Sequence, residues 1–398
     1  MSQAISGSRA KKELVRILGG HRVVQSEAHR YIMVYVDSPQ SASAAVAFAQ
    51  SEGIPVFPHF VGLEEPRSNE WSIRLNLERL NAVTEFSPNS RLASFQTGIR
   101  VESMFEWLYD RNLDLGISPE TFSAMELWEF MLNPSPGRFG PRFGQKWKQV
   151  FAIKAVLPNG RLYSTSLAPA RATGPDFSSL ILLGRGRFGI PLEMTLRLQT
   201  NPRKKHYLAF ALDSLADGLE PAWDVSRHTK PEYIELGTNK DRAEPNLPEH
   251  FLRVELWGEG NRLSVRRERV KRALRNVGRQ VDIPYETLLG LDQTYGFREA
   301  TSCQMFTSRS RLPEALKQIE QQAADRVSKV RVRGFVDSHA CITVDCPSMD
   351  DCDMSPFHPV GVYGSARSGD IQMEIARHLD PNGIFADIES TLGGHNAI

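Results

Sequence analysis

Residues 169–198, PARATGPDFSSLILLGRGRFGIPLEMTLRL, decide the fold of this chain. The stretch opens with a polar turn that ends at Asp176, a residue type that favours a helix N-cap. Gly184, Gly186 and Gly189 follow within six positions, where the lack of a Cβ lets a backbone turn sharply and lets a ligand approach it. Apolar residues then alternate with polar ones, which predicts a strand with one buried face formed by Ile190, Leu192, Met194, Leu196 and Leu198.

This order of turn, glycines and strand resembles the third flavin-contacting segment of the FAD-linked oxidases of the p-cresol methylhydroxylase type, a superfamily that includes vanillyl-alcohol oxidase. The lead-in PARATGPD is most similar to the alkyl-dihydroxyacetone-phosphate synthase branch. The resemblance implies FAD as the cofactor, bound in part by Asp176, Gly184, Gly186, Gly189 and Ile190. Without the resemblance, glycine clusters in a strand-rich chain are more often plain turns, by roughly three to one.

The composition is that of an ordinary globular protein. The chain has 398 residues, 41% hydrophobic and 24% charged, with a net charge of +1, so no overall basic field indicates nucleic acid or a membrane surface. We expect no transmembrane segment and no secretory signal. Four cysteines without a Cys-x-x-Cys pair favour a reducing, cytoplasmic compartment. The cysteines and aspartates of residues 341–353 lack zinc-site spacing, so we predict no metal.

The first third of the chain predicts a strand–helix–strand unit: a strand over residues 31–36, an alanine-rich helix opened by Ser38 and ended by Gly53, and a strand over residues 54–58. A helix over residues 10–18 precedes it. This order resembles the opening of the family's FAD domain and implies that Pro58, His59 and Gly62 lie on the phosphate side of the cofactor.

The loop after residue 58 differs from the family's glycine-rich one. Phe60 and Val61 add bulk where the family exposes backbone N–H groups, and Glu64 and Glu65 add negative charge near two phosphates. His59 has two interpretations: a surface or phosphate-side histidine is favoured over a flavin-linking or catalytic one by roughly four to one.

The second cofactor segment is expected after Pro119. Aligned backwards from Arg142-Phe143-Gly144, the family pattern implies that Pro119, Gly137, Arg142 and Gly144 bind the cofactor, but it places Trp128 and Glu129 where the family has two adjacent glycines. We predict that these two side chains fill the space that admits the cofactor. The alternative is a loop in a different register, with the flavin ring seated differently.

Strands over residues 73–80 and 92–98, a helix over 101–112 and a hairpin over 150–164 complete the predicted first domain. Beyond residue 201 we expect strands over 207–212 and 251–257 joined by long polar connections, then a basic helix over 262–278. The arginines of that helix form a solvated face rather than a phosphate or acidic-partner site by roughly four to one. A strand over 301–306, a helix over 312–327 and strands over 330–335 and 340–344 follow.

The C-terminal sequence HACITV, residues 339–344, resembles a synthase strand of the form Gly-Ala-Cys-Ile-Tyr-Phe, with Thr343 in place of its proton-transferring tyrosine. The synthases' later histidine row is reduced to His358. The resemblance makes His358 and Arg367 the first candidates for substrate contact or catalysis. The turn at Asp380-Pro381 that leads to Phe385 is similar to the family's closing turn.

The sequence therefore predicts an α+β fold: a two-lobed FAD-binding domain of the p-cresol methylhydroxylase type and an α+β cap with an antiparallel sheet. The expected boundaries are an N-terminal helix or tail at 1–21, the FAD-type domain at 22–200, and a cap at 201–398 whose last helix returns to the first domain. Two functions stay open. One is an FAD-dependent oxidoreductase or synthase-like flavoenzyme acting on a small organic substrate; the other is a flavin-free pseudo-oxidase that serves as a partner subunit, a scaffold or a binder of another ligand. A homo-oligomer is compatible with both.

Overall fold

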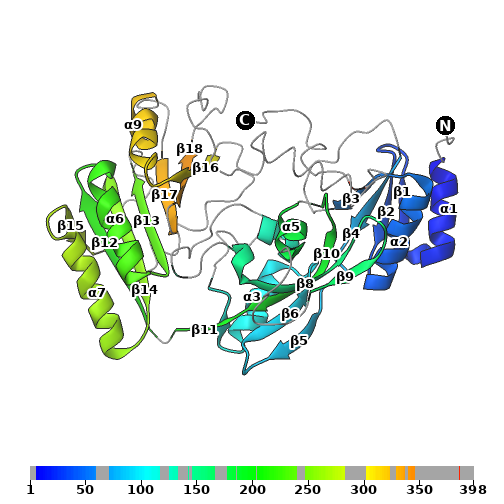
Figure 1. Ribbon diagram of the computed structural model, residues 1–398, viewed down its shortest axis with the longest axis horizontal. Helices are drawn as coiled ribbons and strands as arrows, with labels where there is room; N and C mark the ends of the chain where they lie inside the picture. The colour runs from blue at the N-terminus through cyan, green and yellow to red at the C-terminus, as the bar shows by residue number, and fades with distance from the viewer. Residues whose placement is uncertain are drawn as a thin grey trace.

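The computed structural model describes residues 6–59, 71–116, 125–132, 142, 146–165, 177–184, 186–202, 204–239, 247–282, 302–322, 329–336, 339–345 and 385. Figure 1 shows two sheets in the half that contains the N-terminus and a third sheet, with its own helices, in the other half.

The predicted strand–helix–strand unit contributes two strands, β2 and β3, to a four-stranded sheet of order β1-β2-β4-β3. Strands β2, β4 and β3 run parallel, with β4 between the two strands that helix α2 connects. Ser38 caps α2 by accepting a hydrogen bond from the Ser41 backbone N–H (3.2 Å), and Gly53 ends the helix in the left-handed conformation. The bounds are α1 (Gly7–Leu18), β1 (Val23–Ser26), β2 (Tyr31–Tyr35), α2 (Pro39–Glu52), β3 (Val56–His59) and β4 (Ser72–Asn76).

The second sheet is antiparallel, with the order β5-β6-β10-β8-β9. Its central strand β10 is the alternating strand of the opening motif, and its four predicted inward residues are buried, as is Leu198 directly after it. The elements of this part of the chain are β5 (Val83–Ser87), β6 (Leu92–Gln96), α3 (Val101–Tyr109), β7 (Leu113–Asp114), α4 (Leu127–Leu132), β8 (Val150–Val156), β9 (Leu162–Ser164), α5 (Phe177–Leu183), β10 (Ile190–Arg197) and β11 (Gln199–Thr200). Strands β7 and β11 form a separate two-stranded antiparallel sheet.

The third sheet has seven antiparallel strands in the order β15-β12-β14-β13-β17-β18-β16. Helices α6 and α7 pack on it and on each other (Figure 1). The elements are β12 (Lys205–Leu212), α6 (Leu215–Thr229), β13 (Tyr233–Thr238), β14 (His250–Trp257), α7 (Gly260–Leu274), β15 (Gly278–Val281), β16 (Ser302–Ser308), α9 (Leu312–Gln322), β17 (Lys329–Val336) and β18 (His339–Asp345).

The prediction of long polar connections between residues 212 and 251 was wrong, because α6 and β13 lie there. Gly218 and Pro221 obscured the helix, since both residue types disfavour helix interiors. Gly218 is needed for close packing: a Cβ at this position would lie 2.4 Å from the Leu236 side chain of β13. The basic helix is also shorter than predicted, because α7 ends at Leu274 and β15 begins at Gly278.

Two large hydrophobic cores divide between Leu198 and Leu208. The first extends from Ala10 to Leu198 and includes Phe385, which pairs with Val56 beside β3. We call the part built on this first core the first domain, and the part built on the seven-stranded sheet the cap. The α+β class and the antiparallel sheet of the cap are as predicted. Among the residues described, no helix combines the length and the apolar character needed to cross a membrane.

Candidate functional site

The glycines of the opening motif lie in the turn between α5 and β10. A Cβ at Gly184 would lie 2.3 Å from the Phe188 ring and 2.7 Å from the Leu180 carbonyl oxygen. A Cβ at Gly189 would lie 3.2 Å from both the Ile181 side chain and a backbone oxygen of β8. The turn at Phe188 therefore leaves no free space for a Cβ at Gly184, and the packing of α5 against β8 leaves little space for one at Gly189, with or without a ligand.

Gly186 is the point at which the three predicted cofactor segments meet. It has a φ of +94°, and a Cβ placed on it would lie 3.3 Å from two ring carbons of Pro58 and 3.8 Å from Cη2 of Trp128. Pro58 belongs to the first segment, Trp128 to the second and Gly186 to the third. The structure thus brings one residue of each segment together, and side chains of the protein occupy the space in front of the glycine.

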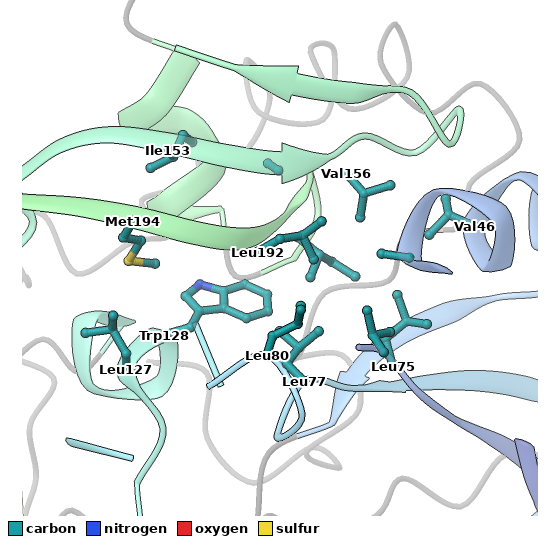
Figure 2. Packing of buried hydrophobic residues seen from close by; sticks show 14 of the residues in the cluster. Val46, Leu75, Leu77, Leu80, Leu127, Trp128, Ile153, Val156, Leu192 and Met194 are labelled. Atoms are coloured by element: carbon teal, nitrogen blue, oxygen red, sulfur yellow. The ribbon is translucent and has the colours of Figure 1, made fainter. Parts of the chain in front are cut away.

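Trp128 is fully buried, with 0% of its surface exposed. Its backbone N–H donates to the Thr97 carbonyl oxygen (3.3 Å), which fixes the start of α4 against the end of β6. Figure 2 shows the indole between Leu77 and Leu80, from the chain after β4, and Leu192 and Met194 of β10. The indole therefore fills the region between the two sheets of the first domain.

Two carboxyl groups accompany the indole in this segment. Glu126 is only 3% exposed, and burial, followed by the negative charges of Glu129 and Glu78, raises its pKa to about 8, although Arg100 acts in the opposite direction. Glu126 is therefore protonated at neutral pH. Sequence reasoning did not identify it, since nothing local distinguishes a buried glutamate from an exposed one.

Arg142, predicted to bind the cofactor, forms an ion pair with Glu232 of the cap. His59 lies at the end of β3, paired with Asn76 of β4, and is half-buried. Ile190 begins β10 and is buried. Thr343 lies on β18, in register with Arg331 and Gln304 of the neighbouring strands. The other predicted site residues lie outside the described residues: Gly62, Pro119, Gly137, Gly144, Asp176, His358 and Arg367. Within the described ranges, no group of three or more His, Cys, Asp or Glu is arranged to hold a metal ion.

Comparisons with known proteins agree with this architecture. Residues 31–166 match the model of a family described as an FAD binding domain. The uncharacterized FAD-linked oxidoreductase YgcU of Escherichia coli (strain K12) is 23% identical over 158 residues, which cover 39% of this chain and 32% of that protein. The chain thus spans about a third of the length of this relative.

Two solved structures share the fold over nearly the whole chain. An alkyldihydroxyacetonephosphate synthase superposes with a TM-score of 0.72 at 14% identity, covering 97% of this chain and 87% of that one. A p-cresol methylhydroxylase with substrate bound gives a TM-score of 0.70 at 13% identity, covering 95% of both chains. Fold and site together define a two-lobed flavoprotein-type domain with a cap. Residues 31–166 thus resemble an FAD binding domain, and the FAD-linked relatives support FAD as the cofactor of this type of domain, while the solved structures show the fold.

The residues that this chain places at the meeting point do not fit FAD in the manner expected from the family. A backbone cradle for a dinucleotide would leave open space beside its glycines, whereas the positions beside Gly184, Gly186 and Gly189 are taken by protein atoms. Trp128, which stands where the resemblance predicts two adjacent glycines, is fully buried among protein side chains. Among the described residues, protein atoms fill the space beside these three glycines and around the indole, so we derive no reaction step through a flavin.

Proposed function

We propose that this chain is a flavin-free member of its superfamily, a pseudo-oxidase that acts as a partner subunit or scaffold rather than through redox turnover. The burial of Trp128 at the meeting point of the three segments carries this proposal. A buried Trp side chain covers about 150–250 Å², and protein interiors are close-packed, so an indole and an isoalloxazine ring cannot share the volume.

The loss of turnover is also consistent with the cap. Thr343 stands where the synthases have their proton-transferring tyrosine, and a threonine hydroxyl is far too weakly acidic to replace a phenol near neutral pH. Thr343 would affect proton transfer, and Trp128 would affect cofactor binding. A protein that no longer catalyses a reaction would tolerate both residues. The cysteine pattern favours the cytoplasm as the place where it acts.

A second candidate function is that of an FAD-dependent oxidoreductase acting on a small organic substrate. The match to an FAD binding domain over residues 31–166 favours it. It requires α4 to move so that the indole leaves the region between the sheets. His358 and Arg367 would then be the first residues to test for substrate contact.

A titration of the purified full-length protein with FAD separates the two. A flavin-free protein shows no absorption band near the flavin maximum as isolated and no saturable change in FAD fluorescence. Trp128→Phe serves as the matched variant, because it reduces the bulk while keeping an aromatic ring at the position. A yellow protein with one FAD per chain supports the second candidate and overturns the first.

A further inference from the structure

Glu232 connects the cap to the first domain. It lies between α6 and β13, and its side chain is 0% exposed. Its two carboxylate oxygens accept hydrogen bonds from Arg266 at 3.2 and 2.9 Å, and one of them also accepts from the Trp257 backbone N–H at 2.9 Å. Arg142 adds a further donor to the other oxygen.

Arg266 belongs wholly to the cap. From α7 it also donates to the carbonyl oxygens of Thr229 (3.2 Å), Trp257 (2.6 Å) and Lys230 (2.7 Å). These bonds fix its guanidinium between α6, α7 and β14. Glu232 and Arg266 therefore form a preorganised receptor on the cap, with a buried carboxylate that is already oriented.

Arg142 approaches this receptor from the segment between α4 and the strand β8 of the first domain, 90 residues away in sequence. Its side chain is 46% exposed, whereas Glu232 is fully buried. An ion pair between two exposed side chains contributes little, but hydrogen bonds to a buried carboxylate are charge-assisted and only weakly screened. Removing a donor from a buried carboxylate also leaves part of its desolvation uncompensated.

We propose that Arg142 and Glu232 form an interdomain clamp that holds the cap closed on the first domain. Arg142 lies in the segment predicted to bind the cofactor. In the structure, this residue instead forms an ion pair between the two domains. The inference rests on the proposed function in one respect: it assumes that the cap and the first domain are in contact when no flavin is bound. Its outcome is separable, since domain opening and FAD binding are measured independently.

The test compares Arg142→Met with the wild-type full-length chain. This variant removes the guanidinium that the first domain contributes to the clamp and leaves the Glu232–Arg266 pair intact. We expect a larger radius of gyration in solution scattering. We also expect trypsin cleavage at the exposed connection near Lys204 to be faster by about tenfold, because opening leaves this connection freer to unfold locally. The circular dichroism of both domains should not change. Arg142→Lys, which keeps the charge but not the fork of donors, should give an intermediate cleavage rate.

Arg309→Met is the matched control. It breaks an exposed arginine–glutamate pair within the cap, Arg309 with Glu220 at 2.7 Å, and should leave both measurements at the wild-type values. Glu232→Gln provides a second approach to the clamp and should open the domains at least as much as Arg142→Met. The proposal is overturned if Arg142→Met and Arg309→Met give the same scattering and cleavage rate as the wild type.

Discussion

Two segments of the first domain, residues 184–190 and α4, behave differently although the sequence predicts both to contact a cofactor. The first keeps its glycines, and the second has Trp128 and Glu129 in their place. In the structure, the protein's own turn and helix leave no free space for a Cβ at Gly184, and α5 and β8 leave little at Gly189, while Trp128 is fully buried in the core. A glycine motif can therefore persist because the fold needs it, and the neighbouring segment is the better indicator of whether a ligand enters.

The largest expected effect comes from emptying the space that the indole fills. Trp128→Ala should lower the free energy of unfolding by about 3–5 kcal/mol, because it removes buried area and leaves a cavity between two sheets. Chemical denaturation followed by circular dichroism measures it, with Trp128→Phe as the control expected to lose less. A loss below about 1 kcal/mol would mean that the indole is not part of the core.

Glu126→Gln tests the buried carboxyl beside the indole. The pKa of Glu126 is raised from 4.5 to about 8 by folding, so its contribution to stability is fully present below pH 4.5 and is lost as the pH rises through about 8. The variant cannot ionise and should be more stable than the wild type by about 2–3 kcal/mol at pH 7, with little difference at pH 4. Denaturation midpoints at several pH values measure this. Equal pH dependence in both proteins would show that Glu126 is hydrated.

Gly184→Ala tests whether packing alone retains the glycine. The added methyl would meet both the Phe188 ring and the Leu180 carbonyl oxygen, so the variant should lose about 1–3 kcal/mol of stability. Thermal unfolding of the variant provides the measurement. Unchanged stability would mean that packing does not retain Gly184. A ligand-binding role would then explain this glycine better, and the contrast between residues 184–190 and α4 would no longer hold.

The smallest effect is expected at Gly186, where the positive φ matters more than space. Gly186→Ala should lose about 1 kcal/mol, close to the loss for Gly53→Ala, whose φ is +66° and which has no neighbour within 4 Å. Thermal unfolding of Gly186→Ala and Gly53→Ala compares the two losses of stability directly. A much larger loss at Gly186 than at Gly53 would mean that Pro58 and Trp128 cannot yield to the added methyl.

Local sequence was sufficient for much of this fold. The alternation at residues 190–198 predicted a half-buried strand, and Ser38 with Pro39 predicted the start of α2, because these signals lie within one element. The match of residues 128–144 to the family pattern places Trp128 in the cofactor space, and this stays a prediction, although the structure buries the side chain. Helix α6 was missed because Gly218 and Pro221 weaken its local signal, and packing against Leu236 compensates for this.

The polar partners of the site could not be predicted in the same way. Arg142 and Glu232 are 90 residues apart, and no local pattern links an arginine to a carboxylate on a different sheet. The same holds for Glu126, whose pKa is raised first by the burial that the tertiary fold produces, and then by the charges of Glu129 and Glu78. Periodicity reports which face of an element is buried, but it does not report which charged group a buried side chain meets.

The most direct test of the central claim is the FAD stoichiometry of the purified full-length protein, determined by absorption before and after incubation with excess FAD and removal of the unbound cofactor. The account predicts a colourless protein that retains no flavin and whose Trp128 fluorescence, isolated by comparison with Trp128→Phe, is not quenched by FAD. One equivalent of retained FAD, with quenching of that fluorescence, would contradict it.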